Sequence, residues 1–357
     1  MRKGLMATAS KRTRFIKAQL DLEGYRANLL RKGTPKRVFH FEHGIDTKIK
    51  AQMFAHFGLT PKPAEGREGE WLAEANLYRT LGIEIFRIYP KGASIPIQSL
   101  TGAGWANEHG GPIQKHEDVE RYPWPKASDI DYSVLDWYEK NLPRDMGVFV
   151  KVSMQELVVG LVGFEPLCFL LFDRPDMVRE IARRVGEFYS ALAETLCGYR
   201  CVFALYGCDD FGFKTATLLP PDVIRREFLP WHKRWAETAH RAGKYYFLHS
   251  CGNLAAIMDD LIDDVRVDAK HSFEEAILPV TEAKTRYGHR LSLLGGLDVD
   301  WIARSDEPRI RAYTRSVLDK CVPGGGYFVG LGNWVTNYTP LQNYLTVLDE
   351  ARRYTNT

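Results

Sequence analysis

The 357-residue chain lacks several features that would assign a protein to a class at once. No apolar run reaches the ~18 residues of a membrane-spanning helix, and no signal-peptide core precedes a small-residue cleavage site. The net charge of +3 is too small to indicate nucleic-acid binding by itself. These absences favour a cytoplasmic protein without a membrane or nucleic-acid partner.

Cysteine is also scarce, with six residues in the whole chain. In a chain of this size, six cysteines do not amount to a disulfide framework, so most of them are expected to be reduced, buried thiols. The dinucleotide fingerprint G-x-G-x-x-G does not follow the first expected strand, which weakens the case for a nucleotide-binding sheet.

Eight short apolar runs alternate with segments of helical periodicity. They lie at residues 37–42, 83–89, 148–153, 202–207, 245–250, 265–271, 291–296 and 327–332. Short apolar strands that alternate with helices indicate a parallel sheet, and eight such units predict an α/β fold, a single (β/α)8 TIM barrel. A doubly wound open sheet is the alternative.

The barrel is expected over residues 37–357, after an N-terminal helical lead-in at residues 1–36. Residues 90–146 follow the second strand and are rich in glycine, proline and tryptophan, with little helical period. A loop of this length in a compact domain is usually functional. We therefore expect an insertion that covers the barrel mouth and selects the substrate.

Polar side chains end nearly every expected strand. They are Glu42, Arg87, Lys151, Asp209, Asp210, His249, Cys251, His271, Asp298 and Asn333. Because the carboxyl ends of the strands of such a barrel meet at one mouth, where catalysis takes place, these side chains are expected to surround a single active site.

The stretch "YFLHSCGN" places a histidine and a cysteine two residues apart at the end of the fifth strand. In an extended strand His249 and Cys251 point to the same side. Imidazole and thiolate are both good zinc ligands, so the pair is a candidate metal site. The alternative is a hydrogen-bonded histidine beside an inert buried thiol.

Three stretches resemble the uroporphyrinogen decarboxylase superfamily. They lie at residues 208–253 ("CDDFGF" to "HSCGN"), 293–302 ("LLGGLDVDWI") and 324–354 ("GGGYFVGLGNW" to "EARRY"), within a resemblance that spans residues 37–354. The resemblance implies a (β/α)8 barrel. The superfamily holds the haem-pathway decarboxylase, cobamide-dependent methyltransferases and related O-demethylases.

The motifs are closer to the methyltransferase branch. The decarboxylase carries "RQAGRY" early and "LGHG" near its last strand, where this chain has "HFEHG" and "LGNW". The methyltransferases bind zinc through H-x-C, which His249 and Cys251 match, and through a later cysteine, which Asn333 replaces. The third zinc ligand is therefore open, with Cys208, Glu42, Asp209 and Asp210 as candidates.

The resemblance implies a methyltransferase that moves a methyl group between a small molecule and a cobamide on a partner corrinoid protein. Catalytic roles are then expected for Asp209, Asp210, His271 and Asn333. Substrate contacts are expected from Glu42, Arg87, Lys151, Phe211, Trp105 and Asp298, and the aromatic members would suit an aryl methyl ether. The alternatives are a decarboxylase of another acid and a non-catalytic binding barrel. A homodimer, as in the decarboxylase branch, also stays open.

Overall fold

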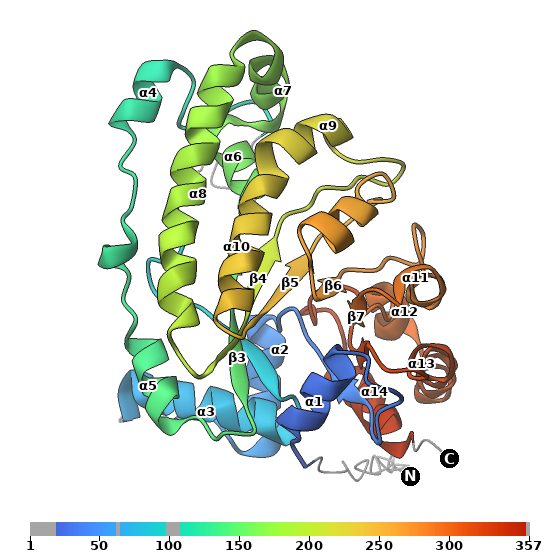
Figure 1. Ribbon diagram of the computed structural model, residues 1–357. Coiled ribbons are helices and arrows are strands. Elements are labelled where there is room, and N and C mark those ends of the chain that lie inside the picture. Colours follow the sequence, from blue (N-terminus) through green and yellow to red (C-terminus); the bar gives the residue numbers. More distant parts are fainter. Residues whose placement is uncertain (1–18, 62–64, 98–107, 355–357) are drawn as a thin grey trace, which may run out of the picture.

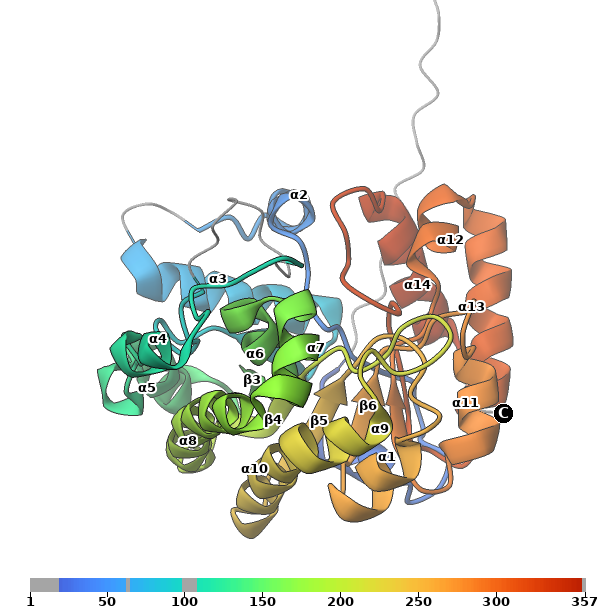
Figure 2. The same ribbon diagram turned by 90° about the horizontal axis from the view of Figure 1, so that it is seen from above.

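A curled sheet of eight parallel strands organises the computed structural model, which describes residues 19–61, 65–97 and 108–354 (Figures 1 and 2). The strand order is β1-β8-β7-β6-β5-β4-β3-β2. The strands are β1 (Phe39–His40), β2 (Ile85–Ile88), β3 (Gly147–Val152), β4 (Val202–Cys208), β5 (Tyr245–His249), β6 (Ala269–His271), β7 (Ser292–Leu294) and β8 (Tyr327–Val329). The expected α/β class and the eight parallel strands are confirmed.

The ladder of backbone hydrogen bonds does not close between β1 and β2, which form the two edges of the sheet in the part of the chain described. Side chains cross this gap instead. Arg37, just before β1, forms an ion pair with Glu84, just before β2, and the ring of Phe41 stacks on that of Phe149 at 5.2 Å. The sheet is therefore curled like a TIM barrel but is open at one seam.

Helices cover the outside of the curled sheet (Figure 2). The α-helices are α1 (Leu22–Leu29), α2 (Thr47–Phe57), α3 (Gly66–Leu81), α4 (His116–Arg121), α5 (Ser133–Asn141), α6 (Gln155–Val162), α7 (Phe164–Asp173), α8 (Pro175–Cys197), α9 (Pro221–Val223), α10 (Leu229–Arg241), α11 (Val280–Tyr287), α12 (Val299–Arg304), α13 (Glu307–Cys321) and α14 (Leu341–Arg353). Short 3-10 and π turns lie at η2 (Ala127–Asp129), η3 (Ile224–Phe228) and η4 (Asp260–Asp264). No single helix among these residues is both long and apolar enough to span a membrane, and α6 and α7 would reach that length only as a pair bent by 96°.

The strand register sorts the inward side chains into layers. Tyr206, Phe247 and Ala269 lie side by side on β4, β5 and β6, and they form a buried apolar layer with the rings of Phe41 and Phe149. Two residues further along the same strands, Cys208, His249 and His271 form the next layer. Since side chains alternate along a strand, both layers face the interior, and a polar layer lies on an aromatic floor.

Helix α1 closes the opposite end of the sheet, away from the arrowheads of the strands (Figure 1). The ring of Tyr25 is fully buried, and its centroid lies 4.3 Å from that of Phe328. The centroids of Phe203 and Phe39 lie 5.6 and 5.7 Å away. The amide of Asn28 donates to the carbonyl of Tyr327 on β8. This part of the expected lead-in is therefore a structural plug of the barrel.

The segment between β2 and β3 contains α4, η2 and α5. Its described part runs beside the helices that follow β3: the backbone N–H of Ile113 donates to the carbonyl of Leu161 on α6, and α4 packs on α8. These residues do not confirm a lid over the mouth. Trp105, expected to contact the substrate, lies outside the described residues.

The packing of Tyr25 against β8 predicts the effects of two substitutions at this position on stability. Tyr25→Ala should lower the free energy of unfolding by about 3–5 kcal/mol, because a large aromatic side chain leaves a buried site. Tyr25→Phe should be neutral or slightly stabilising, because the buried hydroxyl has no hydrogen-bond partner among the described residues. Urea denaturation of both variants measures the two effects, and a large loss in Tyr25→Phe would contradict the packing of this ring.

Candidate active site

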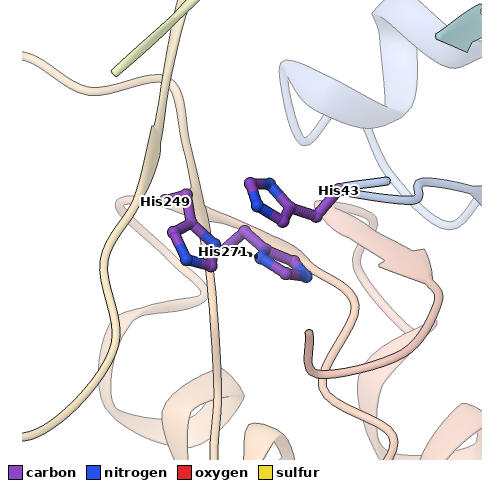
Figure 3. Close-up of side chains that lie close together, drawn as sticks. All are labelled: His43, His249 and His271. Atoms are coloured by element: carbon purple, nitrogen blue, oxygen red, sulfur yellow. Dashed lines mark hydrogen bonds between the residues drawn. The ribbon is translucent and has the colours of Figure 1, made fainter. Parts of the chain in front are cut away.

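Three buried histidines, one beyond β1 and one each at the ends of β5 and β6, stack at the mouth (Figure 3). The ring of His43, beyond β1, lies 4.0 Å from that of His249 at the end of β5, with an interplanar angle of 10°. The ring of His271, at the end of β6, lies 5.1 Å from His249 and 5.4 Å from His43. Their ligand nitrogens lie within 4.8 Å of one another.

Sequence reasoning missed His43, although a signal was available. Phe39, Phe41 and His43 continue the two-residue alternation of β1, and the first two point into the barrel. Extending that alternation by one step beyond Glu42 places the imidazole inside the mouth. The expected strand ended at Glu42, one residue too early to include it.

Hydrogen bonds determine the tautomers of His271 and His249. His271 Nε2 lies 3.0 Å from the carbonyl oxygen of Leu331, which can only accept, so Nε2 carries a proton. In the neutral ring, Nδ1 of His271 is then an acceptor, and it lies 2.8 Å from Nδ1 of His249. His249 must donate there, which leaves its Nε2 with a free lone pair.

The three rings are neutral at pH 7 because they are buried. Desolvation lowers the pKa of His271 to about 3, and it lowers the pKa of His249 and of His43 well below the ordinary value. The positive charge of Lys270 adds to the effect on His249 and His271. Neutral imidazole is the form that binds metals.

The lone pair of His249 faces a thiol and a carboxylate. Nε2 lies 3.4 Å from Sγ of Cys251 and 3.5 Å from Oδ1 of Asp210, and the backbone N–H of Cys251 donates to the same carboxylate oxygen at 2.8 Å. On the other side of the thiol, the amide nitrogen of Asn333 lies 3.7 Å from Sγ. Asp210, Cys251 and His249 thus converge on one point.

Two glycines allow this convergence, because the loops after β4 and β5 touch through their backbones. A Cβ at Gly252, whose φ is +81°, would lie 2.2 Å from the carbonyl carbon of Gly212. The backbone N–H of Gly212 donates to the carbonyl of Cys251 at 3.1 Å. Side chains at either glycine would separate the two loops and therefore Asp210 from Cys251.

The donor set fits a zinc ion. A tetrahedral zinc with bonds of about 2.0–2.3 Å keeps its donor atoms about 3.3–3.8 Å apart, and the two distances from His249 Nε2 fall in this range. Nitrogen, sulfur and oxygen are all zinc donors, and three protein ligands leave one position for a substrate. Burial and the neighbouring Asp210 raise the pKa of the Cys251 thiol. A metal ion would reverse this effect, because a coordinated thiol is deprotonated.

Asp209, next to Asp210 in the sequence, has different surroundings. Its carboxylate is fully buried and accepts hydrogen bonds from the backbone N–H groups of Met154 and Glu156, both at 2.7 Å. The hydroxyl of Ser153 and Nε2 of His232 lie 3.2 and 2.9 Å away. Asp209 thus holds the start of α6, on the opposite side of β4 from His249.

The other predicted site residues also divide into those that lie inside the mouth and those that lie outside it. The structure brings Arg87, Lys151 and Cys208 to the interior of the mouth, on β2, β3 and β4. It does not bring Glu42, Phe211 and Asp298 there. Their positions depend on three different contacts: Glu42 accepts from the N–H of Leu331 and neighbours Tyr344 of α14, Phe211 packs on His232, and Asp298 caps α12 through the N–H of Trp301.

The buried histidines predict acid sensitivity. Because the pKa of His271 is lower in the folded than in the unfolded protein, the unfolded chain binds more protons between about pH 6.5 and 3. As the pH is lowered through this window, the free energy of unfolding should therefore decrease by up to about 1.4 kcal/mol per pH unit for each such group. In His271→Gln the fall should be shallower by about 1 kcal/mol per pH unit between pH 6 and 4.

Denaturation of chelator-treated protein at several pH values measures this slope. The control is His116→Gln, which removes an exposed histidine of α4 and should leave the slope unchanged. Equal slopes in His271→Gln and the parent would contradict the buried, neutral state of His271.

Substitutions of the two adjacent aspartates should lower the stability of the protein by very different amounts. Asp209→Ala should destabilise the protein by about 3 kcal/mol or more, because it leaves buried N–H donors of α6 unpaired. Asp210→Ala should cost about 1 kcal/mol or less, because that carboxylate is partly exposed and caps a single N–H. Thermal unfolding of the two variants after treatment with a chelator compares them without any contribution from a bound metal, and a greater loss in Asp210→Ala would refute the assignment.

Comparison with known proteins supports the fold and the family. The structure superposes on a methyltransferase from Methanosarcina mazei with a TM-score of 0.69 at 18% sequence identity, covering 93% of this chain and 98% of that one. At this identity the likeness concerns the fold alone. The chain is also 22% identical over 291 residues to a uroporphyrinogen decarboxylase of Paraburkholderia phytofirmans, with 74% of each protein covered.

The family model for uroporphyrinogen decarboxylase (URO-D) matches residues 146–354, which include β3 to β8 and the whole Asp210–His249–Cys251 group. More than half of the chain lies in this match. By its sequence and its fold, the chain belongs to the uroporphyrinogen decarboxylase family.

Proposed function

We propose that this protein is a methyltransferase that transfers a methyl group from a small molecule to a cobamide carried by a partner corrinoid protein. The observation that carries the proposal is the convergence of His249 Nε2, Cys251 Sγ and Asp210 Oδ1 at the mouth. A decarboxylase has no need of a thiol and an imidazole in this arrangement. The name of the structural neighbour from Methanosarcina mazei supports the same reading.

In the proposed site, His249, Cys251 and Asp210 hold a zinc ion. The ion would act as a Lewis acid that polarises the heteroatom bound to the methyl group. His271 is a positioning residue: its Nδ1 accepts a hydrogen bond from the Nδ1–H of His249, which aims Nε2 of His249 at the site. Asn333 lies beside Sγ of Cys251 and can donate an N–H to the thiolate.

Asp210 and Cys251 are partly exposed, so a partner protein could approach the group from the mouth. The interior below is closed by the aromatic layer of Phe41, Phe149, Tyr206 and Phe247, so reactants enter and leave at the carboxyl ends of the strands. A cobamide cannot pass such a floor and would have to dock on the rim. This requirement fits a cofactor that stays on its own carrier.

Decarboxylation of a small acid is the second candidate, favoured by the name of the family and of its curated relative. Two assays separate the candidates. With a methoxylated compound supplied as the donor, methyl transfer converts added cob(I)alamin into methylcobalamin and releases the demethylated compound. A change in the visible spectrum records this reaction, whereas decarboxylation releases carbon dioxide from the substrate.

The zinc site gives a direct prediction. Protein purified without chelator should contain about one zinc per chain, and His249→Ala and Cys251→Ser should each lose it because one of three ligands is gone. Elemental analysis measures the content. Asn333→Cys should bind zinc more tightly than the parent, since it places a second thiolate beside Cys251.

The matched control is Cys208→Ser, which removes another buried thiol of the mouth that lies outside the converging group. It should keep its zinc. A parent without metal, or equal zinc in all variants, would contradict the site. Cob(I)alamin methylation that survives in Cys251→Ser would show that the cysteine is not required for the reaction.

A further inference from the structure

Arg87 lies at the mouth in an unusual state. It is on β2, beside Phe149 of β3 in register, and the side chain is 7% exposed. Two aromatic rings flank its guanidinium, that of Tyr89 at 4.8 Å and that of Trp334 at 5.9 Å. A cation between aromatic faces has lost most of its water.

No hydrogen bond or ion pair reaches this guanidinium from the described residues, and its buried Nε has no partner there. The remaining segments, 1–18, 62–64, 98–107 and 355–357, contain no aspartate or glutamate, so no acidic side chain outside the described residues could form an ion pair with it. A buried charge without a partner is costly, and proteins keep such groups mainly where a ligand completes them.

The charge balance around Arg87 leaves a positive excess. Lys151, on the next strand, is paired with Glu156 at 2.9 Å, so this carboxylate is already engaged. The thiol of Cys208 is neutral, because burial raises its pKa to about 12. Two cations therefore face one anion on this side of the mouth.

A chain of ring contacts joins Arg87 to the proposed metal site. The indole of Trp334 flanks the guanidinium and meets the ring of His43 edge to face, at 5.5 Å and 89°. His43 in turn stacks on His249. One small molecule bound at Arg87 would thus extend past Trp334 towards the Asp210–His249–Cys251 group.

We infer that the substrate carries a carboxylate, which Arg87 binds while Trp334 and Tyr89 contact its apolar part. The guanidinium presents a planar fork of N–H donors that matches a carboxylate. The inference rests on the proposed function for the methyl group that such an acid carries. The anion site itself can be tested without methyl transfer.

The test compares two ligands of the same shape, 3-methoxybenzoate and the neutral 3-methoxybenzamide, with methoxyacetate as a smaller acid. Calorimetric titration of the full-length protein should give at least about tenfold tighter binding of the benzoate than of the amide. Arg87→Met should abolish this preference, and Arg87→Lys should keep part of it. Arg79→Met, which removes an exposed arginine paired with Asp145, should keep it all.

A second readout separates ligand binding from a structural role. Without ligand, Arg87→Met should melt about 2 °C or more above the parent, because an unpaired buried charge is gone. Failure of both acids to bind, equal affinity for acid and amide, or a preference that persists in Arg87→Met would overturn the inference. So would a lower melting temperature of unliganded Arg87→Met.

These outcomes are independent of the proposed function. If zinc and cob(I)alamin methylation are found but the parent does not prefer the acid, the carboxylate inference alone fails. If the preference is found but zinc and methylation are absent, the methyltransferase proposal fails and the anion site stands.

Discussion

The hydrogen bond from His271 Nε2 to the carbonyl of Leu331 is the contact on which the chemistry of the mouth depends. A backbone carbonyl cannot donate, so the bond determines the tautomer of His271, which then determines that of His249. Nε2 of His249, which faces Cys251 and Asp210, consequently carries a lone pair and no proton. A single backbone oxygen beyond β8 thus prepares a ligand on β5.

The aromatic floor has an electrostatic role as well as a packing role. Phe41 and Tyr206 keep water from the lower side of the histidine stack, and Tyr206 also hydrogen-bonds Nδ1 of His43 at 2.8 Å. Without this burial the imidazoles would titrate near neutral pH. The same dry surroundings make the unpaired charge of Arg87 costly, so one feature of the fold explains both the neutral histidines and the anion site.

Much of this arrangement follows from the sequence, because strand ends of a parallel barrel converge whatever their exact bounds. The strand periodicity predicts the eight strands, and the H-x-C spacing predicts that His249 and Cys251 share one side. Adjacent residues with the same side chain, such as Asp209 and Asp210, are harder to distinguish. Only the path of the loop between β3 and α6 decides which of the two carboxylates accepts the backbone N–H hydrogen bonds. That Arg87 has no ion-pair partner among the described residues could not be predicted, since this is a property of the packed structure. The seam between β1 and β2 depends likewise on tertiary geometry.

The contact between α1 and β8 has a consequence for how the chain reaches this structure. Asn28 bonds the carbonyl of Tyr327, 299 residues further on, and Tyr25 rests on Phe328. During synthesis, helix α1 cannot make these contacts until β8 has left the ribosome. Contacts that close so long a loop form late, so the nascent barrel passes through a stage in which its aromatic base is exposed and prone to aggregation.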